Sequence, residues 1–587
     1  MKILLTTLNS KYVHSSLALD YLQQFCKQDI WDIRVREFTI NEKTDYIMAE
    51  IFRENPDILC FSCYIWNINS ILDICRDYKK ISPQTIIILG GPEVSYDSQR
   101  VLQRNIAVDY VIKGEGEAAL RELLQSIYLN SSLENIKGIT YRYSGNIHEN
   151  PDRELINKLD MIPSPFKGDL GYYKNRLIYY ETSRGCPNNC TYCLSSTIKG
   201  VRFFSLARVK DDLRYLIEKR VKKVKFVDRT FNCHEKRARE IMQFIIDQTE
   251  KNNASTTFHF EICADLLSEE MLLFLKQVPK GLFDFEIGVQ STMVEALEAV
   301  NRTFNWDKLS RNIKELRKGN NIHLHLDLIA GLPCEGYTQF ADSFNDVYNL
   351  KPDVIQLGFL KLLKGSAIRE QKDDHGYKFQ TNPPYQVLKN KYLDYAELIK
   401  LVQIEDILDN YYNSGAVGNT VSYIIKNVHN GNAFCFYEEL AEYWQNNSLF
   451  AIGHKKEARY SFLKNYIDYF YTSYSQKVNE LLKYDYLLNN KSYNLPSGIE
   501  SCNPENINDL LYSLLKNEGF INKYLAPISS YTRREIKKQV HLECFKYDPL
   551  DCNTITDDLA YLFVYNPVLK RAGKTIKISL ACANSSL

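Results

Sequence analysis

The fold is decided by the stretch Arg184-Gly185-Cys186-Pro187-Asn188-Asn189-Cys190-Thr191-Tyr192-Cys193, which spaces three cysteines as CxxxCxxC. Three thiolates can bind three irons of a [4Fe–4S] cluster, and the fourth iron then stays open to a small molecule. The alternatives are cysteines that only pack in a core, or a zinc knuckle. Zinc sites usually pair one CxxC with a second CxxC or a histidine pair, and no such pair lies near this stretch. The spacing therefore predicts one cluster, held by Cys186, Cys190 and Cys193.

The residues around the cysteines support this interpretation. An apolar run at residues 177–182 is a predicted strand that leads straight into the cysteine loop, and Tyr192 stands directly before the third cysteine. A strand followed by such a loop and a helix resembles the radical S-adenosylmethionine (SAM) enzymes. The resemblance implies that the open iron binds the amino and carboxylate groups of SAM. It also implies that an electron from the cluster cleaves the sulfonium and releases a 5′-deoxyadenosyl radical.

The composition of the chain is that of an ordinary globular protein. Its 587 residues correspond to roughly three or four domains, and 45% are hydrophobic and 25% charged. The net charge of +1 gives no electrostatic argument for binding nucleic acid or a membrane surface. The sequence contains no apolar stretch of about 18 residues, and we read no signal peptide at its start. Fifteen cysteines without a secretory signal predict a reducing cytoplasm.

Residues 1–132 alternate apolar runs with amphipathic stretches. Such alternation predicts a parallel, doubly wound α/β sheet, whose ligands bind beyond the carboxyl ends of the strands. The predicted strands are residues 3–6, 33–38, 58–62, 86–89 and 110–113, and the predicted helices are 17–27, 46–54, 68–78 and 117–128.

Loops rich in polar and glycine residues follow these strands. Paired glycines after a strand, as at Gly90-Gly91, let a ligand approach the backbone closely. The arrangement resembles the Rossmann-like cobalamin-binding domain that precedes many radical-SAM cores. That resemblance places the corrin and its nucleotide tail near Ser62 and Gly90-Gly91. The predicted cobalamin contacts are Ser62, Tyr64, Gly90, Gly91 and Glu115, although plain core packing of Tyr64 is an equal alternative.

One departure from that family concerns the cobalt ligand. Members that coordinate cobalt through histidine carry the motif DxHxxG after the first strand. Around His14, Tyr12 stands in the place of the aspartate and Leu17 in the place of the glycine, so the motif is absent. We therefore expect cobalamin to bind without histidine coordination and interpret His14 as a loop or helix-start residue. Cys60 and Cys63 form a CxxC within an apolar strand, and we interpret them as core residues.

Residues 133–171 have the character of a linker. Residues 138–146 predict a small hairpin, and Pro163 and Pro165 interrupt regular structure. This segment is long enough to fold the carboxyl edge of one sheet over that of the next. We therefore expect the Gly90 and Cys186 loops to face a shared cavity.

Residues 172–383 predict six βα units. This number matches the partial (β/α)6 barrel of the radical-SAM core. The predicted strands are residues 177–182, 224–227, 257–262, 283–288, 322–328 and 354–357, with helices that include 209–218, 236–248 and 309–317.

In barrels of this type the chemistry lies at the carboxyl ends of the strands. The family resemblance places SAM against the first four of these ends, with its adenine near Tyr192 and the Gly331 turn. A polar residue at a strand end can also be only a cap. The predicted SAM contacts are Tyr192, Asp228, Glu261, Gln290 and Gly331.

Residues 384–587 predict a mainly helical C-terminal domain. It begins with a helix at residues 385–401 and ends with a strand pair, 559–565 and 575–580, around a turn at Arg571-Ala572-Gly573. The region resembles the uncharacterised C-terminal extension of a subgroup of cobalamin-dependent radical-SAM proteins. Its cysteines form no CxxC, so we expect no second cluster; they are Cys435, Cys502, Cys544, Cys552 and Cys582.

Together these features predict a cobalamin-dependent radical SAM enzyme with three cofactors, a [4Fe–4S] cluster, SAM and cobalamin. C-methylation, with methylcobalamin supplying the methyl group to a substrate radical, is the favoured outcome, and rearrangement or cyclisation is the alternative. The substrate is expected to be a small molecule or a peptide, and the electron donor a flavodoxin or ferredoxin. A cobalamin-binding sensor or assembly protein with a structural cluster is the rival from another class. Methylthiolation of RNA would require additional N-terminal cysteines and a basic tail, which the sequence lacks.

Overall fold

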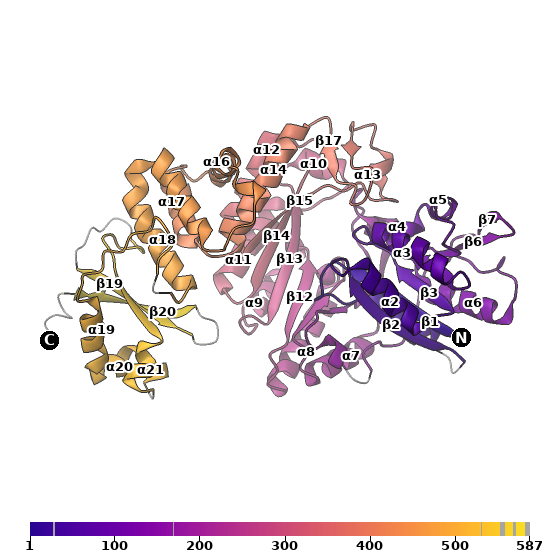
Figure 1. The fold of residues 1–587 in the computed structure, drawn as a ribbon, viewed down its shortest axis with the longest axis horizontal. Coiled ribbons are helices and arrows are strands. Elements are labelled where there is room, and N and C mark those ends of the chain that lie inside the picture. The colour runs from indigo at the N-terminus through magenta and orange to yellow at the C-terminus, as the bar shows by residue number, and fades with distance from the viewer. Residues whose placement is uncertain are drawn as a thin grey trace. The chain divides into compact units, whose positions relative to one another are not determined.

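The chain forms two units, Met1–Leu398 and Ile399–Leu587. They are seen in a computed structural model (Figure 1). The structure describes residues 1–27, 30–167, 170–492, 494–529, 531–551, 558–566 and 571–580.

The first unit begins with a seven-stranded sheet in the order β2-β1-β3-β4-β5-β6-β7. The first five strands in this order are parallel, which confirms the predicted doubly wound sheet. The order reverses between β1 and β3, so the loops that follow these two strands diverge and leave room for a ligand. The strands are β1 (Lys2–Asn9), β2 (Asp32–Thr39), β3 (Ile58–Ser62), β4 (Ile86–Gly90), β5 (Tyr110–Ile112), β6 (Ile139–Tyr143) and β7 (Asn146–Glu149).

The hairpin β6–β7 lies differently from its predicted place in the linker. β6 pairs antiparallel with β5, so the hairpin extends the N-terminal sheet, and this sheet continues through Glu149 instead of ending near residue 132. The physical reason is burial, because Ile139 and Tyr141 pack into the same core cluster as Ile88 and Ile112. A lone hairpin with these apolar side chains would expose them to water.

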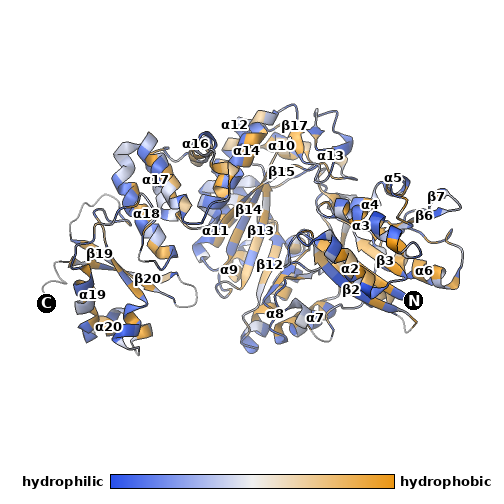
Figure 2. Cartoon of the chain, in the orientation of Figure 1, coloured by the Kyte–Doolittle hydropathy of each residue, from blue (hydrophilic) through white to orange (hydrophobic). Residues whose placement is uncertain are grey.

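Helices cover both faces of this sheet. α1 and α6 bury Leu19 and Leu123 against one face, and α2, α3 and α5 bury Ile51, Ile71 and Leu102 against the other. Figure 2 shows the apolar character of this sheet, in which β3 is orange. The helices are α1 (Leu17–Cys26), α2 (Thr44–Glu54), α3 (Ile68–Ile81), α4 (Pro92–Ser95), α5 (Ser98–Arg104) and α6 (Gly116–Leu129).

The second part of this unit is a six-stranded parallel sheet in the order β15-β14-β13-β12-β11-β8. Strands that follow one another in sequence are neighbours, as the predicted partial (β/α)6 barrel requires. The strands are β8 (Ile178–Tyr180), β11 (Lys223–Phe226), β12 (Thr257–Ile262), β13 (Phe283–Gln290), β14 (His323–Ala330) and β15 (Val354–Phe359). The helices that accompany them are α7 (Leu206–Glu218), α8 (Glu235–Lys251), α9 (Glu269–Leu275), α10 (Val294–Ala299), α11 (Trp306–Gly319), α12 (Tyr337–Asn349) and α13 (Ala367–Glu370).

A second hairpin interrupts the first βα unit of the barrel. β9 (Ser183–Cys186) pairs antiparallel with β10 (Gly200–Phe203), and the remaining cysteines lie in the loop between them. Gly185 is essential to this pairing, because its φ is +102° and a Cβ there would overlap the carbonyl oxygen of Gly200. The hairpin therefore holds the start of the cysteine loop against β10.

The helix predicted at residues 385–401 begins ten residues later. β16 (Lys378–Phe379) pairs with β17 (Val387–Lys389), and α14 spans Tyr395–Leu408. Residues 385–387 are extended and hydrogen-bonded to the end of the barrel. The Val387 N–H donates to the carbonyl of Leu360, and the carbonyl of Tyr385 accepts the N–H of Leu362. These backbone bonds compete with helix formation, which a local sequence pattern does not reveal.

The second unit is helical at first and ends in a small sheet. Its described helices after α14 are α15 (Gly418–Asn427), α16 (Ala433–Asn446), α17 (Ala458–Phe470), α18 (Ser475–Asn489), α19 (Ile507–Lys516), α20 (Glu518–Tyr524) and α21 (Arg533–Lys537). The antiparallel sheet β18-β19-β20 comprises Val540–Cys544, Leu559–Tyr565 and Ala572–Ser579.

The predicted strand pair is confirmed in this sheet, while β18 was not predicted. Ala572 and Gly573 belong to β20 and not to the turn, and residues 567–570 lie outside the described residues, as do Cys552 and Cys582. β18 shares its core with α19, where Leu542 packs with Leu510 and Leu514.

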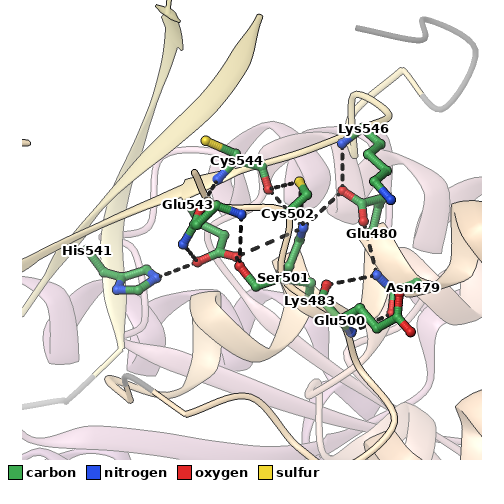
Figure 3. A network of polar contacts seen from close by, with 11 residues as sticks. Asn479, Glu480, Lys483, Glu500, Ser501, Cys502, His541, Glu543, Cys544 and Lys546 are labelled. Carbon is green, nitrogen blue, oxygen red and sulfur yellow. Dashed lines mark hydrogen bonds and ion pairs between the residues drawn. The ribbon is translucent and has the colours of Figure 1, made fainter. Parts of the chain in front are cut away.

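A buried lysine joins α18 to β18 in this unit (Figure 3). Lys483 Nζ lies 3.1 Å from Glu480 Oε2 and 4.0 Å from Glu543 Oε1, and it donates a hydrogen bond to the carbonyl of Cys544 at 2.8 Å. His541 Nε2 also lies 2.9 Å from Glu543 Oε2. Because buried carboxylates are costly unless paired, this ammonium group compensates two of them at once.

Candidate functional site

The three predicted cluster cysteines line one cavity of about 160 Å³ in the barrel. Cys186 ends β9, and Cys190 and Cys193 follow in the loop. Among the described residues, the sulfur atoms of Cys186, Cys190 and Cys193 do not form a set in which every pair of atoms lies within 4.8 Å. A single zinc ion would require such closeness, whereas a cluster, with a separate iron for each thiolate, does not. The assignment of Cys186, Cys190 and Cys193 as the cluster ligands stays a prediction.

Polar groups surround these sulfur atoms. The Ser195 N–H donates to Cys193 Sγ at 3.4 Å, and the Thr230 hydroxyl lies 3.6 Å from Cys186 Sγ. A guanidinium nitrogen of Arg302 lies 3.8 Å from Cys190 Sγ. Donors and a cation at these distances stabilise thiolates, which are the form that binds iron.

A fourth cysteine, Cys263, lies at the end of β12 and lines the same cavity. Burial raises the pKa of its thiol to about 11, despite the opposing effect of Arg302. Cys263 is therefore a protonated thiol near neutral pH, and it stands outside the CxxxCxxC loop. Its position makes it a useful control for the three predicted ligands.

We call the cavity lined by the three predicted ligand cysteines the cluster cavity. Three of the predicted SAM contacts, Tyr192, Glu261 and Gln290, also line it. Gln290 ends β13 with φ +72°, an uncommon conformation for a residue with a side chain. Among the described residues, Gln290 Oε1 and Arg302 Nε are buried and have no hydrogen-bond partner. Buried polar atoms usually have partners, so these two are available to a ligand in the cavity.

The other two predicted SAM contacts do not line this cavity. The buried Asp228 carboxylate accepts hydrogen bonds from the Thr182 N–H at 2.9 Å and its hydroxyl at 2.6 Å, and from the Ser183 hydroxyl at 2.5 Å. Asp228 thus fixes the turn that leads into the cysteine loop. The carbonyl of Gly331 accepts from Tyr377 and Asn390 at 2.9 and 3.0 Å. Their role as SAM contacts stays a prediction.

Charged residues inside the barrel were missed by the sequence interpretation. Arg229, Glu286, Arg302 and Asp327 also line the cluster cavity. Burial and the nearby Glu286 and Glu261 raise the pKa of Asp327 to about 8. A signal existed, because polar or charged residues recur at alternate positions of β12, β13 and β14, as at His259 and Glu261 or His325 and Asp327, and so face one side of the sheet. Arg302 lies in a loop, and no pattern distinguishes it.

All five predicted cobalamin contacts line a second cavity, of about 1010 Å³. It lies at the carboxyl ends of the N-terminal strands, where the loops after β1 and β3 diverge. Barrel residues such as Arg184 and Leu194 complete its wall. The volume is at the upper end of the range for small-molecule sites, as a large cofactor requires.

The two paired glycines have different roles. Gly91 has φ +103°, and a Cβ there would lie 2.6 Å from the carbonyl oxygen of Cys63, so only glycine fits. A Cβ on Gly90 would meet no protein atom closer than 3.8 Å. Gly91 is therefore required by the fold, whereas Gly90 leaves open space at the cavity wall.

An aromatic pair lies on the same wall. The Tyr64 and Trp66 rings stack with centroids 4.4 Å apart, and Trp66 Nε1 donates to the carbonyl of Leu8 at 3.1 Å. The pair is thus a fixed apolar surface facing the cavity. His14 also lines the cavity and its Nδ1 lies 2.6 Å from the Tyr179 hydroxyl.

Glu115 lines the cavity, but its carboxylate is bound to the barrel. Glu115 Oε1 lies 2.7 Å from Arg202 Nη2 and 3.3 Å from Arg184 Nη1. Glu115 Oε2 accepts the N–H of Ile156 at 2.8 Å. The Arg184 guanidinium also pairs with two further carboxylates, with Nη2 2.6 Å from Glu117 Oε1 and Nε 2.9 Å from Glu181 Oε1. These pairs hold the first residues of the cysteine loop against α6, a connection that the sequence alone did not indicate.

Removing this arginine should destabilise the first unit strongly. The change Arg184→Met leaves three buried carboxylates near one another, and burial already raises the pKa of Glu181 to about 7. We expect the free energy of unfolding to fall by about 3–5 kcal/mol, the usual cost of breaking a buried ion pair. Urea unfolding followed by tryptophan fluorescence measures the change.

The matched control is Arg214→Met, because Arg214 pairs with Asp211 on the surface of α7. Exposed pairs of this kind contribute about 1 kcal/mol or less. Equal shifts of the unfolding midpoint in the two variants would contradict the role assigned to Arg184.

The two cavities adjoin one another. Ser195, directly after the cysteine loop, and Arg229, after β11, line both of them. We expected the Gly90 and Cys186 loops to face one cavity. Gly90 and Gly185 do line the larger cavity together, whereas Cys186 itself lines the smaller one.

Comparison with known protein families agrees with this geometry. Residues 3–124 match the B12 binding domain, and residues 180–347 match the Radical SAM superfamily. The chain is a cobalamin-binding radical SAM protein. The predicted fold, with a cobalamin-binding domain and a radical SAM domain, is confirmed, and so are the predicted cofactors, cobalamin, SAM and a [4Fe–4S] cluster. Residues 373–560 match the family described as "Protein of unknown function (DUF4080)", which corresponds to the predicted C-terminal extension.

Two similar sequences are described as methyltransferases. The 2-(S-pantetheinyl)-carbapenam-3-carboxylate methyltransferase of Streptantibioticus cattleyicolor is 23% identical over 426 residues, covering 66% of this chain and 62% of that protein. An uncharacterized methyltransferase of Pyrococcus horikoshii is 26% identical over 328 residues, covering 54% of this chain and 70% of its own. The chain thus spans less than two thirds of the first of these relatives.

A solved structure shares the fold. The cobalamin-dependent S-adenosylmethionine radical enzyme OxsB with aqua-cobalamin bound has a TM-score of 0.59 at 15% identity, covering 90% of this chain and 84% of that chain. In the described residues of this radical SAM protein, we find no helix with the length and apolar character of a membrane span.

Proposed function

We propose that this radical SAM enzyme transfers a methyl group from SAM to a carbon atom of a small-molecule or peptide substrate, with cobalamin as the methyl carrier. The observation that carries the proposal is the shared wall of the two cavities at Ser195 and Arg229. A substrate carbon at this wall would be within reach of both cofactors. Holding reacting groups together in this way lowers the barrier to reaction.

The residues have distinct roles in this proposal. When bound, the cluster would supply an electron that cleaves one SAM to methionine and a 5′-deoxyadenosyl radical, and cobalamin would carry a methyl group from a second SAM, which leaves as S-adenosylhomocysteine. Cys186, Cys190 and Cys193 would hold the cluster, and Arg302 would stabilise its negative charge. Gln290 Oε1 would accept a hydrogen bond from SAM.

The walls of the cavities serve to exclude water. Tyr64 and Trp66 give the larger cavity a fixed apolar surface, and the Arg184 ion pairs close its junction with the barrel. Exclusion of water protects a carbon radical from side reactions.

The electron donor is proposed to be a flavodoxin or ferredoxin. We propose the cytoplasm as the location, because fifteen cysteines and an oxygen-sensitive cluster suit a reducing compartment.

Transfer of an isotopic label tests the reaction. The reconstituted enzyme is incubated without oxygen with SAM that carries a deuterated methyl group, a strong reductant and an extract of small molecules and peptides. We expect a product that contains the labelled methyl group, formed together with 5′-deoxyadenosine. The measurement is mass spectrometry of the products, with a Cys186→Ala variant as the control.

Other outcomes have a clear meaning. A changed substrate without labelled carbon, formed with 5′-deoxyadenosine, would show rearrangement or cyclisation and contradict methyl transfer. Labelled product in the Cys186→Ala variant would show methyl transfer that does not need the cluster.

A further inference from the structure

A second set of metal-ligating side chains lies in the C-terminal unit, outside the site described above. His429 follows α15, and Cys435 and Glu439 lie one turn apart on α16. Among the described residues this is the one set of three or more such side chains whose ligand atoms all lie within 4.8 Å of one another. Residues four apart on a helix share one face, so α16 presents the thiol and the carboxylate together toward His429.

The distances between these atoms resemble those around a tetrahedral zinc ion. Cys435 Sγ lies 3.6 Å from Glu439 Oε1, and His429 Nε2 lies 3.9 Å from Glu439 Oε2. With usual zinc–ligand bond lengths, a tetrahedral site separates sulfur from oxygen by about 3.6 Å and nitrogen from oxygen by about 3.4 Å. The first distance already agrees, and the second requires a small movement of one side chain.

Two tyrosines hold the carboxylate in place. The hydroxyl groups of Tyr466 and Tyr471 donate to Glu439 Oε2 at 3.0 and 2.6 Å. Partners that orient a metal ligand in this way strengthen metal binding.

Another polar cluster of the same unit provides a contrast (Figure 3). It also contains a thiol, a histidine and glutamates, but the buried ammonium of Lys483 lies between them and pairs with Glu480 and Glu543. In the residues that the structure describes, no lysine or arginine forms an ion pair with Glu439. A metal cation is the charge that would complete the His429 set.

We propose that His429, Cys435 and Glu439 bind one zinc ion, with the fourth position open to solvent. One sulfur, one nitrogen and one oxygen ligand suit zinc, and a site with three protein ligands usually keeps a water molecule in the fourth position. The Glu439 side chain is 39% exposed, so water and the ion can enter. The proposal does not depend on methyl transfer, because none of its residues belongs to the first unit.

The test uses the full-length enzyme with its cluster and cobalamin in place, supplied with one equivalent of zinc. Zinc per chain is measured by mass spectrometry after gel filtration, and X-ray absorption at the zinc edge reports the ligands without interference from iron or cobalt. We expect about one zinc per chain, with a single sulfur near 2.3 Å and nitrogen and oxygen near 2.0–2.2 Å.

The variants separate this site from adventitious binding. Cys435→Ser should lower zinc affinity roughly 10-fold or more, whereas Cys502→Ser should leave it unchanged, because Cys502 faces Lys483. Absence of bound zinc, or a spectrum with no sulfur or with several, would overturn the proposal. So would unchanged zinc affinity in Cys435→Ser. If that variant fails to fold, the absorption spectrum of the unaltered enzyme decides.

Discussion

Replacing Cys190 by alanine should abolish SAM cleavage while leaving cobalamin bound. Cys190 is a buried member of the three thiols that line the cluster cavity, and alanine has no ligand to offer an iron. Without the cluster no electron reaches SAM, so release of 5′-deoxyadenosine should fall at least about 100-fold, to background. The larger cavity does not include Cys190 among its lining residues, so corrin content should not change. Iron analysis, 5′-deoxyadenosine release and corrin absorbance measure the three effects.

The matched control is Cys263→Ala. Cys263 lines the same cavity, but its thiol is outside the CxxxCxxC loop and is protonated near neutral pH. This variant should keep about four irons per chain. Loss of the cluster in Cys263→Ala as complete as in Cys190→Ala would show that the ligands are not limited to the three predicted cysteines.

The sequence identified those features whose cause is local. The predicted strands of both sheets follow from short apolar runs, and β3 and β12 have the predicted bounds. The cysteine spacing marked three thiols that line one cavity, and their role as cluster ligands stays a prediction. Gly90 and Gly91 marked the larger cavity because a strand end without side chains leaves room for a ligand.

Features that depend on distant contacts could not be predicted in this way. Asp228 has the position of a ligand contact at a strand end, yet it is bound to Thr182 and Ser183, 46 and 45 residues earlier. Glu115 follows a strand as cofactor contacts do, but Arg202 lies 87 residues later in the sequence and engages its carboxylate. The partner of a charged side chain is a property of the folded chain, and a single sequence does not contain it.

Filling the larger cavity, where we propose that cobalamin binds, should have the opposite effect, with loss of the corrin while SAM cleavage continues. Gly90→Leu is the suitable change, because a Cβ there meets no protein atom closer than 3.8 Å and Gly90 lines the cavity. Gly91 is unsuitable, since its φ of +103° and the nearby Cys63 carbonyl would make any substitution disturb the fold. We expect bound corrin to fall roughly 10-fold or more, because the added side chain occupies space that the cofactor needs.

The same variant should still cleave SAM. The cluster cavity is lined by neither Gly90 nor its neighbours, so 5′-deoxyadenosine release should stay within about 2-fold of the unaltered enzyme, while labelled methyl product disappears. Gly418→Leu is the control, because Gly418 begins α15 in the other unit and a Cβ there meets no atom within 4 Å. Corrin absorbance, 5′-deoxyadenosine release and labelled product are measured on the same preparations. If Gly90→Leu lost its corrin but formed methylated product at the normal rate, cobalamin would be dispensable. The N-terminal sheet would then be a cofactor domain that the barrel does not need for its reaction.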